Sequence, residues 1–204
     1  MNINKLFLYS KNTDAFSSQR GYNYQTLKTL ETWVENYLEN GKDDIYCEFE
    51  EDIFQKNNFD KNLKFRQIKL YSSNFSFSSD EIKKCISHFF MLSIKSDYND
   101  FTKEFIFETN TNVAAQYTDN DAKLLKEWVD SQKNLDDEKL CRFAEKVKGI
   151  VTEYIDKQKN SIKENETASE AFDIFQKLDD NFWKDFTKQI KWKFIGESPD
   201  MEFS

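Results

Sequence analysis

The chain has 204 residues, of which 38% are hydrophobic and 16% aromatic. That length suffices for one domain, or for one domain with an appended helical part, and the aromatic content predicts a core built on Phe, Tyr and Trp. The formal net charge of −8 argues mildly against a nucleic-acid partner, because contacts to phosphate need Lys and Arg. No apolar run approaches the roughly 18 residues of a membrane span, and the N-terminus lacks a signal-peptide pattern. We therefore expect a cytoplasmic protein.

Cysteine and histidine usage excludes several kinds of site. Cys47, Cys85 and Cys141 are scattered and form no C-x-x-C pair, which argues against a disulfide framework or a zinc knuckle. His88 is the only histidine, and we interpret it as a helix-face residue beside the core rather than a ligand. Catalysis, if present, must therefore rest on carboxylates, lysine and metal.

Hydrophobic periodicity predicts a helix over residues 21–40, after a segment at 6–9 that is either a short strand or an ordered arm. The apolar positions of this helix recur at three- and four-residue spacing: Tyr24, Leu27, Leu30, Val34, Tyr37 and Leu38. Later elements are predicted as follows: helices at 79–95, 119–132, 136–158, 167–178 and 179–189, and strands at 101–109 and 191–195. The sequence thus predicts an α/β core over residues 1–112 and a helical extension over 113–204 that packs on it.

A β-hairpin is predicted over residues 46–71, between the first two helices. Polar residues alternate with aromatic and β-branched ones on both sides of a loop through Asn57 and Asn58. Alternation predicts these sets on single faces: Glu48, Glu50 and Asp52 on the first strand, and on the second Gln67 with Lys69, opposite Arg66, Ile68 and Leu70. Glu51 is expected to point away from Asp52 unless a bulge turns it. If the polar faces coincide, carboxylates lie beside one amide and one ammonium group.

These side chains match the needs of metal-assisted phosphodiester hydrolysis. Magnesium binds oxygen ligands, and Asp52 offers a carboxylate, Gln67 an amide oxygen and Ile68 a backbone carbonyl. A bound metal lowers the pKa of a coordinated water and neutralises charge on the phosphate. Lys69 can orient that water and stabilise the transition state. Glu50 is expected to complete the metal shell or to bind a second ion.

Basic residues gather around the same hairpin, so the local charge can override the acidic total. They are Lys56, Lys61, Lys64, Arg66 and Lys69.

The order of helix, acidic strand, Q-x-K strand, helix and strand resembles the PD-(D/E)xK nuclease core, the fold of many restriction endonucleases. The resemblance implies a mixed sheet flanked by helices, with Asp52 as the first acid and Gln67 and Lys69 as the second motif. Glutamine in place of the second acid is a known variation in the Mrr-like branch. An acid often follows an aromatic residue in the first helix of that branch. Here Gln25 follows Tyr24, so a supporting role through a hydrogen bond is implied for it.

Four segments are similar to the double-stranded DNA endonuclease domain found at the N-terminus of anti-phage effectors of CBASS and Lamassu systems. They are R-G-Y-N-Y-Q at 20–25, E-F-E-E-D-I at 48–53, Q-I-K at 67–69 and F-W-x-x-F-x-x-x-I-x-W at 182–192. The resemblance implies a bacterial Mg²⁺-dependent endonuclease, with Mn²⁺ able to substitute, that acts on double-stranded DNA. It also implies activation by clustering, as a homo-oligomer or through other subunits of the defence system. Family members usually continue into a sensor or oligomerising domain, which is expected beyond residue 204 unless the chain is a stand-alone subunit.

Two features leave alternatives open. The usual core has a separate strand before the acid-bearing one, so either residues 45–54 serve as both strands or residues 6–9 supply the missing one. The function also has rivals: a degenerate nuclease fold used for oligomerisation or docking, and a nuclease that acts on RNA. The aromatic residues of 172–186 are predicted to form core or subunit interface rather than a base-stacking platform, because acids are interleaved among them.

Overall fold

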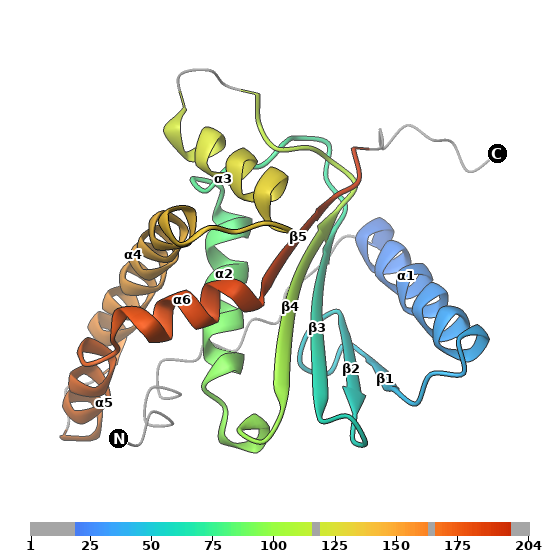
Figure 1. The fold of residues 1–204 in the computed structure, drawn as a ribbon, viewed down its shortest axis with the longest axis horizontal. Coiled ribbons are helices and arrows are strands. Elements are labelled where there is room, and N and C mark those ends of the chain that lie inside the picture. The colour runs from blue at the N-terminus through green and yellow to red at the C-terminus, as the bar shows by residue number, and fades with distance from the viewer. Residues whose placement is uncertain (1–18, 116–118, 163–165, 197–204) are drawn as a thin grey trace.

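A computed structural model shows a five-stranded mixed sheet with helices on both faces (Figure 1). It describes residues 19–115, 119–162 and 166–196. The strands lie side by side in chain order: β1 (Asp44–Cys47), β2 (Ile53–Asn57), β3 (Asn62–Lys69), β4 (Thr102–Thr109) and β5 (Ile190–Phe194). β2 pairs antiparallel with both β1 and β3, whereas β3, β4 and β5 run parallel to one another. The predicted α/β class is confirmed.

The helices divide between the two faces of the sheet. One face carries α1 (Gln19–Leu38) alone, and the other is covered in two layers (Figure 1). The second face is covered by α2 (Asp80–Ser93), α3 (Asn120–Ser131) and α6 (Asp180–Gln189), with α4 (Asp137–Ser161) and α5 (Glu166–Gln176) outside them and the short helix η2 (Ser96–Tyr98) after α2. None of the helices in the described ranges is long and apolar enough to cross a membrane.

The core lies between the sheet and the second face, and aromatic rings fill it as the composition predicted. Phe105 and Phe107 of β4 are fully buried on that side, as their alternation predicted. Phe89 of α2 stacks on Phe105 with ring centroids 5.2 Å apart, and Phe90 stacks on Trp183 of α6 at 5.6 Å. A single cluster joins these rings to residues of α4, α5 and β5. Residues beyond 112 therefore share one sheet and one core with the residues before them.

Residues 45–54 serve as both strands, which is one of the two alternatives that the sequence left open, because the segment folds back on itself. The premise that Glu48, Glu50 and Asp52 lie on one face of an extended strand is wrong. β1 ends at Cys47, β2 begins at Ile53, and these two residues pair with each other in antiparallel register. Between them the chain turns at Glu48, which takes a left-handed conformation with φ of 54°. Carboxylates disfavour strands, and four of them in five residues are accommodated better by a turn that points them in different directions. The segment thereby supplies the separate first strand, while residues 6–9 lie outside the described ranges.

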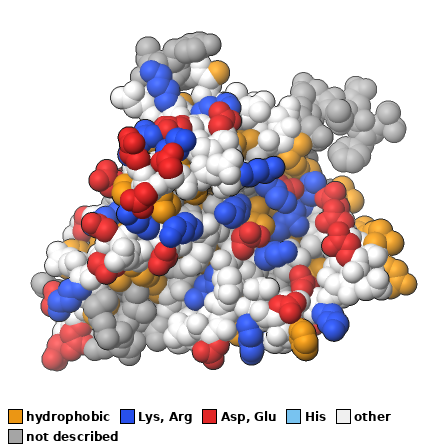
Figure 2. Space-filling model, viewed as in Figure 1, with side chains coloured by type: hydrophobic (Ala, Val, Ile, Leu, Met, Phe, Trp, Pro, Cys, Tyr) orange, Lys and Arg blue, Asp and Glu red, His pale blue; other side chains and the backbone are white. Residues whose placement is uncertain are grey.

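Helix α1 presents its polar side to the sheet and its apolar side to solvent. Gln25, Thr29 and Thr32 are its buried side chains. The large apolar side chains on its outer surface are each about half exposed or more: Tyr22, Leu27, Leu30, Trp33, Val34, Tyr37 and Leu38. Figure 2 shows hydrophobic and acidic atoms along the side of the molecule where α1 lies in Figure 1. An amphipathic surface helix normally has the opposite orientation.

Candidate active site

The turn between β1 and β2 meets the end of β3. Since β2 is antiparallel to β3, with Ile53 opposite Arg66, the residue before Ile53 lies level with the residues that follow Arg66. The Ile68 backbone N–H donates a hydrogen bond to Asp52 Oδ2 at 2.6 Å. The other carboxylate oxygen, Oδ1, has no hydrogen-bond partner among the described residues. The structure thus brings Asp52 to the Q-I-K segment.

The surroundings of Asp52 make its negative charge costly. Burial is the main cause that raises its pKa to about 6, and the charges of Glu51 and Glu48 add to the shift. The charge of Lys69 and the hydrogen bond from Ile68 oppose it. A carboxylate in this state gains from a nearby cation, because a positive charge favours the ionised form.

Lys69 interacts electrostatically with these acids but forms no ion pair with any of them. Its charge lowers the pKa values of Asp52 and Glu48. Within the described ranges its ammonium group has no hydrogen bond or ion pair. The ammonium group is therefore available to a ligand at the end of β3.

Glu51 joins the site, contrary to the predicted direction of its side chain. It is 6% exposed; its Oε2 accepts a hydrogen bond from Gln67 Nε2 at 3.3 Å, and its Oε1 lies 2.8 Å from His88 Nδ1. Burial lowers the pKa of His88, but the hydrogen bond to Glu51 and the charges of Glu51, Glu50 and Asp52 outweigh burial and raise it. Because the amide nitrogen of Gln67 donates to Glu51, the amide oxygen of Gln67 remains available to a ligand.

Sequence reasoning missed Glu51 and His88 because it treated residues 48–52 as extended. The density of carboxylates in that segment was the available signal, since an extended strand would place three of them close together on one face, where they repel one another. For His88 the sequence offered no comparable signal. Its position on α2 opposite Glu51 follows from the tertiary fold alone.

Glu50, the other predicted ligand, is directed to different partners. Its Oε1 accepts hydrogen bonds from Lys95 and, at 2.6 Å, from the Tyr98 hydroxyl. The premise that Glu50 and Asp52 share a strand face is wrong, because both lie in the turn. We therefore leave Glu50 out of the proposed set of ligands.

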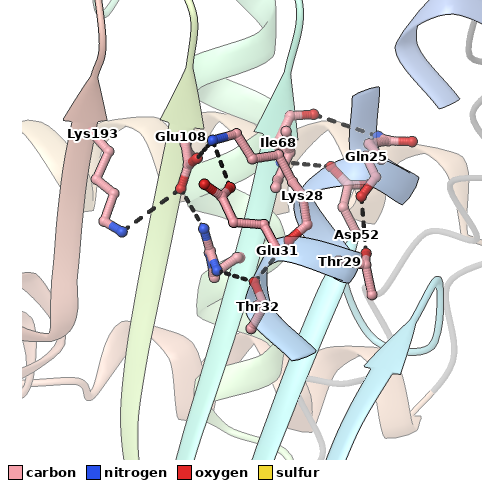
Figure 3. A network of polar contacts seen from close by, with 10 residues as sticks. Gln25, Lys28, Thr29, Glu31, Thr32, Asp52, Ile68, Glu108 and Lys193 are labelled. Atoms are coloured by element: carbon pink, nitrogen blue, oxygen red, sulfur yellow. Dashed lines mark hydrogen bonds and ion pairs between the residues drawn. The ribbon is translucent and has the colours of Figure 1, made fainter. Parts of the chain in front are cut away.

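Gln25 lies at the site, as a supporting residue should. Its Nε2 donates to the backbone oxygen of Ile68 at 3.4 Å (Figure 3). Its Oε1 is buried and has no hydrogen-bond partner in the described part of the chain. A buried unpaired oxygen costs roughly 1–3 kcal/mol, and a cation or its bound water is the kind of partner that removes such a cost.

Behind the site, an ionic cluster fixes α1 to the sheet (Figure 3). Arg66 of β3 forms an ion pair of 2.7 Å with Glu108 of β4 and donates to Thr32 Oγ1 of α1 at 2.7 Å. Lys28 and Lys193 lie 3.5 and 3.7 Å from the Glu108 carboxylate. Burial alone would raise the pKa of Glu108, but Arg66 and then the two lysines lower it. Arg66 was counted in the basic hairpin cluster, but it is buried here and holds Glu108 instead.

The donors at the end of β3 suit a hard cation. The described residues contain no group of three His, Cys, Asp or Glu side chains placed to hold a metal, which argues against a preformed zinc site. The oxygens available are one carboxylate and several neutral carbonyls, from Asp52, Gln67, Ile68 and Gln25. Magnesium accepts such a sparse set because it keeps several of its waters.

The whole chain was also compared with known proteins. The family model described as Cap4, dsDNA endonuclease domain, matches residues 17–196. The chain belongs to this family. The match covers α1, the turn with Asp52, the Q-I-K strand and the α6–β5 segment, so the resemblance inferred from these four segments is confirmed. No curated protein and no solved structure gives a significant match. This Cap4 endonuclease domain is accordingly a DNA-cleaving hydrolase domain by family.

Proposed function

We propose that this Cap4 endonuclease domain hydrolyses double-stranded DNA with Mg²⁺, or Mn²⁺ in its place, at the end of β3, as an effector of anti-phage defence. The observation that carries the proposal is the position of Asp52. Its partly buried carboxylate has a raised pKa and accepts from the Ile68 N–H, beside Gln67 and a Lys69 that has no ion pair within the described ranges.

Each residue has a role that follows from its chemistry. Asp52, the amide oxygen of Gln67 and the backbone oxygen of Ile68 would hold the ion, and it would supply a water of lowered pKa and neutralise phosphate charge. Lys69 orients the attacking water and stabilises negative charge that develops on the phosphate. Gln25 fixes the Ile68 carbonyl from α1 and offers its own free oxygen to a bound water.

The acidic surface supports control by clustering. With a net charge of −8, a single domain has weak non-specific attraction for DNA. Domains held together by a sensor domain, a partner subunit or self-association bind DNA through several sites at once, and the second contact then benefits from a high effective concentration. We propose that this domain cleaves efficiently only when it is clustered.

Plasmid cleavage with Mg²⁺ or Mn²⁺ at several protein concentrations tests the proposal. Wild type should cleave, and Lys69→Ala should be slower by about 100-fold or more, the effect of removing a group that stabilises transition-state charge. Lys64→Ala is the matched control, since Lys64 lies exposed on the same strand. Equal cleavage by Lys69→Ala and wild type would show that the site is misplaced.

The rival function is a degenerate nuclease fold used as an oligomerisation module, which the exposed apolar side of α1 favours. Calorimetric titration with Mn²⁺ separates the two. The nuclease requires binding that is lost in Asp52→Asn. Absence of any binding that depends on Asp52 would favour the module.

A further inference from the structure

The outer side of α1 is the largest group of exposed apolar side chains in the described part of the chain. We call this surface the α1 stripe, and its members are between 48% and 82% exposed: Tyr22, Leu27, Leu30, Trp33, Val34, Tyr37 and Leu38. Single exposed apolar residues are ordinary, but a contiguous group on one helix marks an interaction surface.

The spacing of the α1 stripe fits a partner helix. Leu27, Leu30, Val34 and Tyr37 are separated by three, four and three residues, which is the a and d pattern of helices that pack lengthwise. The opposite side of α1 is already fixed to the sheet through Gln25, Thr29 and Thr32. The helix therefore presents a coiled-coil face to solvent while its own domain lies behind it.

The charges of α1 indicate which helix would fit. Glu31 and Glu35 lie in its second half, and Glu39 follows it. Its first turn has no acid and its last turn has no base, the reverse of the distribution that the helix dipole favours. A second α1 in antiparallel orientation places each acidic end beside the start of the other helix, where the dipole is positive.

We propose that α1 is a dimerisation surface that takes a second copy of this chain, with the two α1 helices antiparallel about a two-fold axis. Seven side chains exposing on the order of 100 Å² each would bury roughly 1,400 Å² in a symmetric pair, within the range of specific interfaces. Because the contact is isologous, it closes at two copies.

Dimerisation also bears on the site. Gln25 lies on the back of the same helix and contacts Ile68, so a second copy that holds α1 in place also holds Gln25 against the ligand carbonyl. A dimer presents two sites to one duplex. This consequence rests on the proposed nuclease activity, whereas the association itself does not.

Sedimentation of the full chain tests the dimer directly. Wild type should associate with rising concentration, and Leu30→Glu and Val34→Glu should each weaken the dimer by at least about 100-fold, because they bury a charge at the centre of the contact. Phe59→Glu is the matched control: Phe59 is 79% exposed on the β2–β3 turn, outside the α1 stripe, and this variant should dimerise as wild type does. Glu35→Lys should weaken the dimer several-fold if the helices are antiparallel. Circular dichroism confirms that each variant is folded.

A wild type that stays monomeric up to about 1 mM, the weak end of specific affinity, would overturn the proposal. A dimer that survives both Leu30→Glu and Val34→Glu would place the interface elsewhere and overturn it too. Cleavage assays on the same samples keep the two proposals apart. Association without cleavage counts against the nuclease and leaves the dimer standing. Cleavage by a wild type that stays monomeric counts against the dimer and against activation by clustering, and leaves the nuclease standing.

Discussion

The two faces of the sheet are held by different kinds of contact. On one face, rings from α2 and α6 pack on Phe105, and a ring from α3 packs on Trp192. On the other face, α1 is attached through the Lys28–Glu108 ion pair, the Thr32 hydroxyl and the Gln25 amide, with its apolar side turned away. Apolar packing has little directionality, whereas hydrogen bonds fix both distance and direction. The first face therefore provides stability, and the second determines where Gln25 lies relative to the site.

The largest loss of stability is expected from the aromatic face. Phe90 is fully buried and contacts Trp183, Phe175 and Phe186, so Phe90→Ala should lower the free energy of unfolding by about 3–5 kcal/mol. Urea titration measures it. The rate of cleavage per folded molecule should not change, because the ring contacts of Phe90 are with α5 and α6 and not with the residues around Asp52. A change below about 1 kcal/mol would contradict the assignment of stability to this face.

Breaking the ionic cluster on the α1 face should cost nearly as much. Arg66→Met leaves Glu108 buried without its closest partner, and we expect a loss of about 3 kcal/mol. The double variant Arg66→Met, Glu108→Leu should recover most of that loss, since it removes both charges. The recovery distinguishes this face from the aromatic one.

The pH dependence of the same cluster has a definite sign. The folded protein lowers the pKa of Glu108 below its ordinary value of 4.5. The cluster therefore contributes its full stability above about pH 4.5, and the contribution is lost as pH falls through the lowered value. The stability difference between wild type and the double variant should be constant above pH 5 and change only below about 4.5. A change near neutral pH would contradict this.

Sequence reasoning succeeded where a single local rule was sufficient. Alternation in β3 and antiparallel pairing with β2 brought Asp52 to Gln67 and Lys69 without further information. The turn at Glu48 was missed because alternation presumes an extended chain. The spacing of Leu27, Leu30 and Val34 predicted a helix correctly, but periodicity shows only that one side is apolar, and whether that side faces the core or solvent depends on the rest of the fold.

Asp52→Asn should stabilise the metal-free protein while abolishing cleavage. The folded pKa of about 6 lies above the ordinary 3.8, so the ionised carboxylate lowers stability above pH 6, and the cost disappears as pH falls toward 4. Asn can still accept from the Ile68 N–H and carries no charge. The side chain of Asp52 is only partly buried, so we expect the free energy of unfolding to rise by about 2 kcal/mol at pH 8 and not at pH 4. Thermal unfolding in EDTA at both pH values measures it, and a loss at pH 8 would contradict the prediction.

The smallest expected effect concerns Glu51, which accepts from Gln67 and lies beside His88. Glu51→Gln leaves one acceptor oxygen for two neighbours, Gln67 Nε2 and His88 Nδ1, so the amide of Gln67 is held less firmly. The Mn²⁺ concentration for half-maximal cleavage should then rise about 10-fold or more. Glu50→Gln is the matched control from the same turn, because Glu50 contacts Lys95 and Tyr98 instead, and its Mn²⁺ midpoint should match wild type. The opposite result, a shift for Glu50→Gln and none for Glu51→Gln, would restore Glu50 as a metal ligand. It would also show that the turn between β1 and β2 changes conformation when the ion binds. The turn would then be able to move, whereas the aromatic core on the other side of the sheet is rigid.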